Sequence, residues 1–177
     1  DRFYKSIFEI MPSLQIGDKV LEVGCGAGES TRRIIEMMKD GVHYEASEFD
    51  PRYVEILSRT EFPVKVCQES VYELKRGEGA FQLIIMLEVL EHLQNYEKAL
   101  SELFRVSGKY VMISVPNEPL WRILNMIRGK YIPSLGNTPG HINHWTPSRL
   151  TRLLSKYGRI VRINTPLPWI IVLVEKK

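Results

Sequence analysis

Short apolar runs alternate with amphipathic segments along most of this sequence. The apolar runs are rich in β-branched residues, which is typical of buried strands, whereas the amphipathic segments repeat their apolar residues at helical spacing. The predicted strands are residues 20–23, 42–47, 64–67, 81–87, 109–115, 159–164 and 169–174. The predicted helices are residues 2–12, 30–40, 51–59, 96–106 and 147–156. Strands that alternate with helices predict a doubly wound α/β sheet.

The last two predicted strands depart from this alternation. Only a short Pro-Leu-Pro link at residues 166–168 separates them, and such a link is too short for a crossover between parallel strands. We therefore expect the final pair to be antiparallel. The run 81–87 is apolar apart from Gln82, which indicates a strand covered on both faces.

Residues 117–146 interrupt the pattern with a further helix and a loop. The apolar positions of this helix are Trp121, Ile123, Leu124, Met126 and Ile127, and its cationic positions are Arg122, Arg128 and Lys130. The spacing predicts one apolar face with the cations on the other side. Insertions at the carboxyl edge of such a sheet build substrate sites. We therefore expect an acceptor lid at about residues 117–146, with a helix that only packs against the sheet as the alternative.

Length and composition fit one globular domain, which we expect to span residues 1–177. The net charge of +3 is too small to indicate nucleic-acid binding by itself. No apolar run is long enough to span a membrane, and no signal peptide is visible. Cys25 and Cys67 are expected to be reduced thiols, which predicts a cytoplasmic location. Because the sequence begins at Asp1 rather than Met, we leave open whether further residues precede it in the natural protein.

A glycine-rich turn between the first strand and its helix carries the main functional signal. Gly24, Gly26 and Gly28 follow the strand, and a helix opens directly after them. This arrangement brings bare backbone against a ligand, and the helix N-terminus adds unpaired N–H groups and partial positive charge. The spacing is G-x-G-x-G rather than the G-x-G-x-x-G of dinucleotide folds. Glu29 in the first helical turn also disfavours a pyrophosphate, and Glu22 before the turn suits an ammonium group, so a nucleoside-amino acid is favoured over NAD.

The stretch V-L-E-V-G-C-G-A-G-E-S-T at residues 20–31 resembles motif I of class I S-adenosylmethionine (SAM) dependent methyltransferases. The resemblance covers nearly the whole chain. It implies a Rossmann-like seven-stranded sheet with an antiparallel last strand, in the order 3-2-1-4-5-7-6, and SAM as the cofactor. The cofactor-binding residues that it implies are Glu22, Gly24, Cys25, Gly26, Gly28, Glu48, Phe49, Glu69, Ser70 and Leu87.

Individual roles follow partly from position and partly from this resemblance. Glu48 ends the second strand, where an acid of nucleotide-binding folds accepts hydrogen bonds from the ribose hydroxyls; an NAD fold would use this acid too. The resemblance places Phe49 against the adenine, and Glu69 and Ser70 near the adenine amino group. The family usually has Asp where this chain has Glu69. By the same resemblance the methionine end lies near Glu22, Gly24 and the backbone of Leu87.

The segment E-V-L-E-H-L at residues 88–93 resembles the signature of the type 11/12 small-molecule branch, which includes ubiquinone-pathway O-methyltransferases. If the segment is helical, Glu88, Glu91 and His92 share a face. Such a set can hold a divalent cation or act as acid and base. Small-RNA 2′-O-methyltransferases use an E-x-x-E-H set with a further histidine as metal ligands, and His141 has the matching spacing here. His144 is a second nearby candidate. A set that only orients a loop is the alternative.

We therefore predict a SAM-dependent methyltransferase that acts on a small-molecule acceptor, at oxygen. The candidate catalytic residues are His141, His92 and Glu88, and the candidate cation ligands are Glu88, Glu91, His92 and His141. One alternative is a metal-assisted RNA 2′-O-methyltransferase, which predicts a basic stripe along the acceptor face. The other is an NAD-binding oxidoreductase or a non-catalytic nucleotide-binding module. We do not expect a nucleic-acid partner or a membrane-spanning segment.

Overall fold

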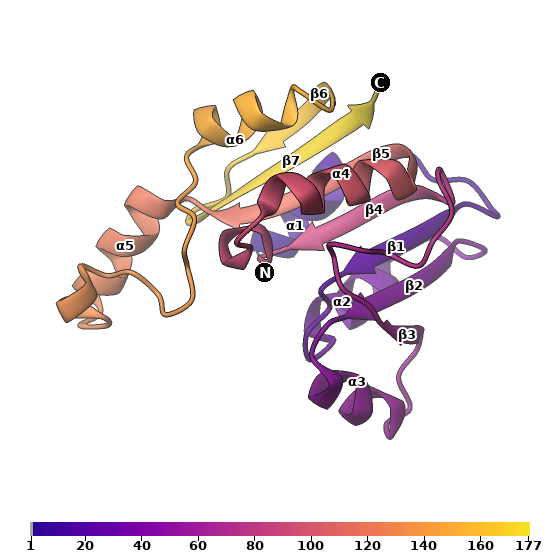
Figure 1. Ribbon diagram of the computed structural model, residues 1–177, viewed down its shortest axis with the longest axis horizontal. Helices are drawn as coiled ribbons and strands as arrows, with labels where there is room; N and C mark the ends of the chain where they lie inside the picture. Colours follow the sequence, from indigo (N-terminus) through magenta and orange to yellow (C-terminus); the bar gives the residue numbers. More distant parts are fainter. Residues whose placement is uncertain (1) are drawn as a thin grey trace.

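The seven predicted strands lie side by side in one mixed sheet in the computed structural model, which describes residues 2–177 (Figure 1). The strands are β1 (Lys19–Val23), β2 (His43–Glu48), β3 (Lys65–Gln68), β4 (Phe81–Leu87), β5 (Ser107–Pro116), β6 (Gly158–Asn164) and β7 (Trp169–Lys176). Their order is β3-β2-β1-β4-β5-β7-β6. Strand β7 pairs antiparallel with both β5 and β6, and the other pairs are parallel. The predicted doubly wound fold with an antiparallel last strand is confirmed.

Helices cover both faces of this sheet. They are α1 (Arg2–Ile10), α2 (Glu29–Met37), α3 (Pro51–Ser58), α4 (Tyr96–Val106), α5 (Glu118–Ile127) and α6 (Pro147–Leu154), with the short 3₁₀ turns η1 (Leu90–His92) and η2 (Ile132–Ser134). Apolar residues of α4 and α6 pack on one face, and those of α1 and α2 pack on the other. Strand β4 is therefore buried on both sides, which explains its nearly continuous apolar sequence.

Side-chain caps fix where two of the helices begin. Asp50 Oδ1 accepts a hydrogen bond from the backbone N–H of Arg52 at 2.9 Å, and Thr146 Oγ1 accepts one from the N–H of Arg149 at 3.2 Å. A proline follows each cap in the first helical turn, where its missing N–H costs nothing. Both predicted helix starts are confirmed.

The topology places the site at the carboxyl ends of β1, β2 and β4. The chain leaves β1 toward β2 on one side and reaches β4 on the other, so the strand order reverses between β1 and β4. Crevices outside such a reversal bind ligands in open α/β sheets. The end of β4 also lies beside β5, with Leu87 paired to Ser114.

Helix α5 differs from its prediction. The predicted apolar residues do not all pack against the sheet, because Ile123, Met126 and Ile127 are exposed while Asn125 is buried. Figure 1 shows α5 reaching beyond the end of the sheet, where only the loop after it lies alongside. Among the described residues, no helix combines the length and apolar character needed to cross a membrane.

Candidate active site

The turn between β1 and α2 is held in a conformation that suits glycine. Gly24, Gly26 and Gly28 have φ angles of 80°, 53° and 78°, a region that L side chains rarely adopt. A Cβ on Gly24 would lie 2.6 Å from Val89 Cγ2, and one on Gly28 would lie 2.5 Å from the Phe62 ring. A Cβ on Gly26 would meet no atom within 4 Å. The middle glycine therefore presents bare backbone to open space.

Glu48 ties this turn to the neighbouring strand. Its Oε2 accepts a hydrogen bond from the backbone N–H of Gly26 at 2.8 Å. Its Oε1 accepts two more, from the N–H groups of Phe49 and Asp50, each at 2.8 Å. Because a carboxylate oxygen has two lone pairs, Oε2 keeps acceptor capacity for a further donor. This fits the hydroxyl-binding role predicted for Glu48.

A cavity of about 240 Å³ opens beside Glu48 and the turn. It is lined by Val23, Gly24, Glu48, Phe49, Glu69, Ser70, Val71, Tyr72, Glu88, Val89, His92 and Leu93. Of the predicted cofactor-binding residues, Gly24, Glu48, Phe49, Glu69 and Ser70 are in this set. Cys25, Gly26, Gly28 and Leu87 adjoin the cavity in sequence but are not among its lining residues.

Glu22 is turned away from this cavity. Its Oε2 accepts hydrogen bonds from the hydroxyls of Thr31 at 2.7 Å and Tyr44 at 2.9 Å. Burial raises the pKa of Glu22, and the two hydroxyl donors oppose that rise. These bonds brace the turn against α2 and β2, and Glu22 is not among the residues that line the cavity. Thr31 and Tyr44 are partners that the sequence did not indicate.

Glu69 lies at the far wall of the cavity and is buried. Its carboxylate pairs with the guanidinium of Arg76 at 3.3 Å, and Arg76 also reaches Glu45 at 3.3 Å. Its backbone N–H donates to the carbonyl of Glu48 at 3.0 Å, which links the ends of β2 and β3. Glu69 is therefore fixed in place from two directions.

Glu88 begins a second group of ionisable side chains at the end of β4. The helical face expected for Glu88, Glu91 and His92 is wrong, because Glu88 has a φ of 56° and only Leu90–His92 form a 3₁₀ turn. Glu88 instead accepts a hydrogen bond from Ser114 Oγ at 2.7 Å. Burial raises the pKa of Glu88 to about 7 against the opposing effect of this bond.

Glu91 is buried, and neither of its carboxylate oxygens has a hydrogen-bond partner in the described chain. Burial, followed by repulsion from Glu88, raises the pKa of Glu91 to about 9. Its backbone carbonyl accepts hydrogen bonds from the N–H groups of Ile142 and Asn143, each at 3.0 Å. The loop after α5 is therefore pinned against this segment. A buried carboxylate without a donor is costly unless a proton or a cation satisfies it.

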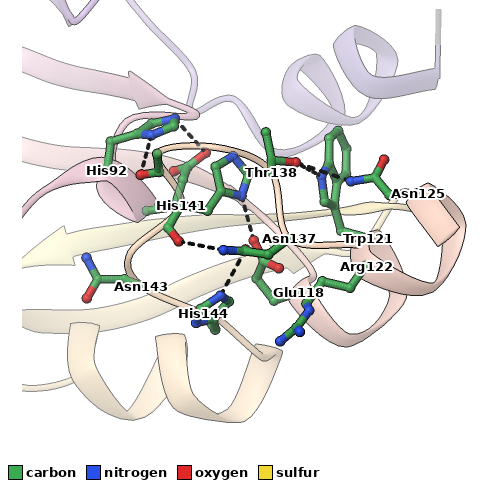
Figure 2. Close-up of polar contacts among 12 residues, drawn as sticks. His92, Glu118, Trp121, Arg122, Asn125, Asn137, Thr138, His141, Asn143 and His144 are labelled. Carbon is green, nitrogen blue, oxygen red and sulfur yellow. Dashed lines mark hydrogen bonds and ion pairs between the residues drawn. The ribbon is translucent and has the colours of Figure 1, made fainter. Parts of the chain in front are cut away.

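His141 arrives on that loop and forms a buried pair with Glu118 (Figure 2). Its Nδ1 lies 2.6 Å from Glu118 Oε1 and donates to it. Nδ1 of His92 donates to the carbonyl of Gly140 at 2.9 Å, and the rings of His92 and His141 are 4.9 Å apart. Because both Nδ1 atoms are engaged as donors, the neutral imidazoles offer their Nε2 lone pairs.

Sequence reasoning missed Glu118. It is the only acid between residues 103 and 174, and it directly follows the end of β5. That isolation was the available signal, but the 23-residue separation from His141 gives no local clue to their contact.

A second cavity, of about 440 Å³, lies on the other side of Glu118. It is lined by Glu118, Arg122, Ile123, Met126, Leu135, His144 and Thr146. Glu88 and His92 line the first cavity and Glu118 lines the second. His141 itself lines neither cavity, but it contacts His92 of the first and Glu118 of the second.

Comparison with known protein families shows the family to which this chain belongs. Residues 2–159 match a family model described as "Methyltransferase domain". The chain belongs to the methyltransferase domain family. The class I resemblance drawn from the glycine-rich turn is confirmed, and the type 11/12 branch fits the same match. The match speaks against the NAD-binding alternative.

One curated relative of this methyltransferase domain is a Mycolicibacterium smegmatis protein named "Probable S-adenosylmethionine-dependent methyltransferase". The two are 24% identical over 160 residues, which is 89% of this chain and 58% of the relative. The chain therefore spans less than two thirds of that relative's length.

Solved structures share the methyltransferase fold at low identity. A SAM-dependent methyltransferase from Aquifex aeolicus superposes with a TM-score of 0.75 at 18% identity, covering 98% of this chain and 89% of that one. A chain from the complex between the Haloferax volcanii Trm112 methyltransferase activator and a methyltransferase gives a TM-score of 0.77 at 10% identity, covering 99% and 89%. These likenesses show the fold.

SAM is the cofactor that the family implies, and the residues present fit it. The open backbone at Gly26, the free acceptor capacity of Glu48 and the cavity lined by Gly24 and Glu48 match a nucleoside ligand. The methyltransferase also has a set that fits a cation. One ligand atom from each of Glu91, His92 and His141 lies within 4.8 Å of the others. Glu88, a predicted ligand, is outside this set.

Proposed function

We propose that this protein transfers the methyl group of SAM to an oxygen atom of a small-molecule acceptor. The observation that carries the proposal is the buried His141–Glu118 pair, in which Glu118 lines the second cavity and His141 contacts His92 of the cavity beside Glu48. A methyl donor in the first cavity and an acceptor in the second would meet at this pair.

The chemistry divides between cofactor and protein. The sulfonium supplies an electrophilic methyl group, so the protein must mainly align the acceptor and exclude water. An acceptor hydroxyl also has to lose a proton. His141 is suited to take that proton at Nε2, because Nδ1 is committed to Glu118 and the carboxylate stabilises the resulting imidazolium. We assign His92 and Glu88, which line the first cavity, to the wall beside the methyl donor.

We further propose that residues 117–146 form the acceptor lid of a single domain. Their loop is bonded to the end of β4 through Asn143, whose Nδ2 donates to the carbonyl of Leu93 at 2.7 Å. Asn137 joins two of the histidines, accepting from His144 Nε2 at 3.1 Å and donating to the His141 carbonyl at 3.2 Å. These bonds support a preformed acceptor wall.

The test uses SAM with a labelled methyl group and a panel of phenols, catechols and fatty acids. We expect label transfer to at least one hydroxyl-bearing compound, and loss of transfer with retained SAM binding in His141→Gln. His43→Gln is the matched control, because His43 is an exposed histidine that lines neither cavity. Transfer that survives His141→Gln unchanged would remove this histidine as the base.

A cation-assisted reaction, including RNA 2′-O-methylation, is a second candidate. It is supported by Glu91, His92 and His141, because both imidazoles have the Nδ1–H to oxygen bond that orients metal-binding histidines. A divalent cation held there would polarise an acceptor hydroxyl. Glu118 would then orient His141 as a metal ligand rather than as a general base.

A further inference from the structure

Charge is divided unevenly along this chain. Residues 119–174 contain eight basic residues and no acidic residue. The basic residues are Arg122, Arg128, Lys130, Arg149, Arg152, Lys156, Arg159 and Arg162. Residues 1–118 contain 14 basic and 20 acidic residues, a net charge of −6. The small overall charge therefore conceals a strongly cationic C-terminal third.

The first part of this cationic segment also carries apolar side chains into solvent. We call residues 122–135, from α5 through η2, the arm. Its exposed apolar residues are Ile123, Met126, Ile127, Tyr131, Ile132 and Leu135, with exposed fractions from 39% to 76%. The described chain has 14 exposed large hydrophobic residues in all, so almost half lie within this short arm. Isolated exposed apolar residues are ordinary, but such a concentration marks an interaction surface.

The exposure does not come from a loosely attached helix. Trp121 Nε1 and Asn125 Nδ2 both donate to Thr138 Oγ1, at 2.9 Å and 3.2 Å (Figure 2). Asn125 Nδ2 also donates to the carbonyl of Gly136 at 2.9 Å. Arg122 Nε donates to the carbonyl of Leu135 at 2.9 Å. These bonds fold the end of the arm back against α5. The arm is thus held in shape while its apolar residues stay outside.

We propose that the arm docks this protein on a membrane surface that bears anionic lipids. Exposed aliphatic side chains can enter the boundary between headgroups and acyl chains, while exposed cations such as Arg128 and Lys130 meet the lipid phosphates. Charge complementarity supports this occupant, because the arm contains no acid that an anionic surface would repel. Single-stranded RNA is bound by cations together with stacking aromatic residues, and the arm offers mainly aliphatic ones.

The arm shares Ile123, Met126 and Leu135 with the second cavity, which ends at Glu118. A membrane-dissolved acceptor is the substrate class that this arrangement favours, and this part alone rests on the proposed function. Docking itself does not depend on methyl transfer.

The test is therefore vesicle flotation in the absence of SAM. The probes are vesicles of phosphatidylcholine, with or without phosphatidylglycerol. We expect the protein to float with the anionic vesicles, to remain unbound with the neutral ones, and to be released by high salt.

Two arm variants and two matched controls sharpen the test. Reversing both cations in Arg128→Glu/Lys130→Glu should weaken binding to anionic vesicles by about 30-fold or more. Ile127→Ser/Ile132→Ser should weaken it by about tenfold or more, since less apolar surface is buried. Lys39→Glu/Lys65→Glu and Ile56→Ser change exposed residues elsewhere and should bind as the wild type does. All these positions are exposed, and a thermal melt checks that each variant is folded.

Equal binding to both vesicle types, or binding that survives both arm variants, would overturn the proposal. It would also be wrong if the wild type ignores vesicles and the apolar variant turns a dimer into a monomer in sedimentation velocity, because the arm would then be a protein interface. Binding of a single-stranded RNA oligonucleotide without vesicle binding would reject it in favour of nucleic acid. None of these results depends on whether methyl transfer occurs.

Discussion

Five ionisable side chains, three carboxyl groups and two imidazoles, gather near the ends of β4 and β5, and the three carboxyl groups have different partners. Glu118 is paired with His141, Glu88 accepts a bond from a serine hydroxyl, and Glu91 has no donor in the described chain. Burial favours the protonated form of Glu88 and Glu91. Carboxyl groups in such different surroundings can therefore take different roles in one reaction.

Glu118→Gln tests the orientation of His141. The amide keeps the shape of the side chain but no longer stabilises an imidazolium, so we expect kcat for hydroxyl methylation to fall by about 100-fold or more. The KM for SAM should stay unchanged, because Glu118 does not line the cavity beside Glu48, where we propose that SAM binds. Steady-state kinetics with an acceptor found by the label-transfer panel measure both values. Glu61→Gln, at an exposed acid, is the matched control and should match the wild type.

The raised pKa of Glu91 predicts that stability falls as pH rises. The folded state keeps a proton up to a pKa of about 9, whereas the unfolded carboxyl releases it near the ordinary value of 4.5. The free energy of unfolding should therefore decrease between these values, by up to about 1.4 kcal/mol per pH unit for this group. Urea unfolding in chelator measures the slope.

Two substitutions separate the contributions to that slope. Glu91→Gln should remove most of it up to the pKa of about 9. Glu88→Gln should remove only the part below its own pKa of about 7. A slope unchanged in Glu91→Gln would contradict the assignment of the retained proton to this carboxyl.

The turn between β1 and α2 shows that neighbouring glycines are needed for different reasons. Gly28 is closed in by the Phe62 ring, whereas Gly26 faces open space. A glycine is therefore required by the packing of the fold at position 28, and by the close approach of a ligand to the backbone at position 26. Ligand-binding and structural roles can therefore be separated within one short element.

Gly28→Ala should mainly lower stability, whereas Gly26→Ala should mainly weaken SAM binding. Gly28→Ala combines a positive φ with a clash, so we expect a loss of about 2–4 kcal/mol in the free energy of unfolding. Gly26→Ala should cost only about 1 kcal/mol but weaken SAM binding at least about tenfold, because the added methyl group occupies the open space. Thermal melts and calorimetric titration with SAM measure the two effects. A Gly26→Ala variant that binds SAM normally would place the cofactor elsewhere.

The alternation of strands and helices could be predicted because periodicity and caps are local properties. The positions of Asp50 and Thr146 as caps and the antiparallel final pair follow from neighbouring residues in the same way. The exposure of the apolar residues of α5 could not be predicted, and the helical placement of Glu88 was wrong. Surface exposure of α5 depends on what packs beside it, and the left-handed backbone of Glu88 is imposed by tertiary contacts. The His141–Glu118 pair was missed because a loop brings these residues together.

Across the whole molecule, the candidate cation ligands join segments that are far apart in sequence. Glu91 and His92 follow β4, and His141 lies about 50 residues later on the loop after α5. A cation bound by all three would therefore stabilise the folded state by mass action and hold that loop against the segment after β4.

Adding Mn²⁺ or Zn²⁺ tests this cation candidate. At about 100 times the dissociation constant, binding contributes about 2.7 kcal/mol, which should raise Tm by roughly 5–10 °C in a chain of this size. The shift should be larger at alkaline than at neutral pH, because Glu91 must lose its proton to bind. Differential scanning fluorimetry with chelator as the reference measures it. Glu91→Gln should abolish the shift and Glu61→Gln should retain it; no shift with either metal would eliminate the cation-assisted candidate.

The three backbone hydrogen bonds accepted by Glu48 have a consequence for turnover. They fix the glycine turn and the start of α3 before any ligand arrives, so a nucleoside bound there, as we propose, would enter a site that is already shaped. Little conformational entropy of the backbone would then be lost on binding, and the demethylated product would dissociate from the same rigid site. We therefore expect the rate at which SAM replaces the demethylated product to depend on the contacts of each with the site, and not on a slow rearrangement of the turn.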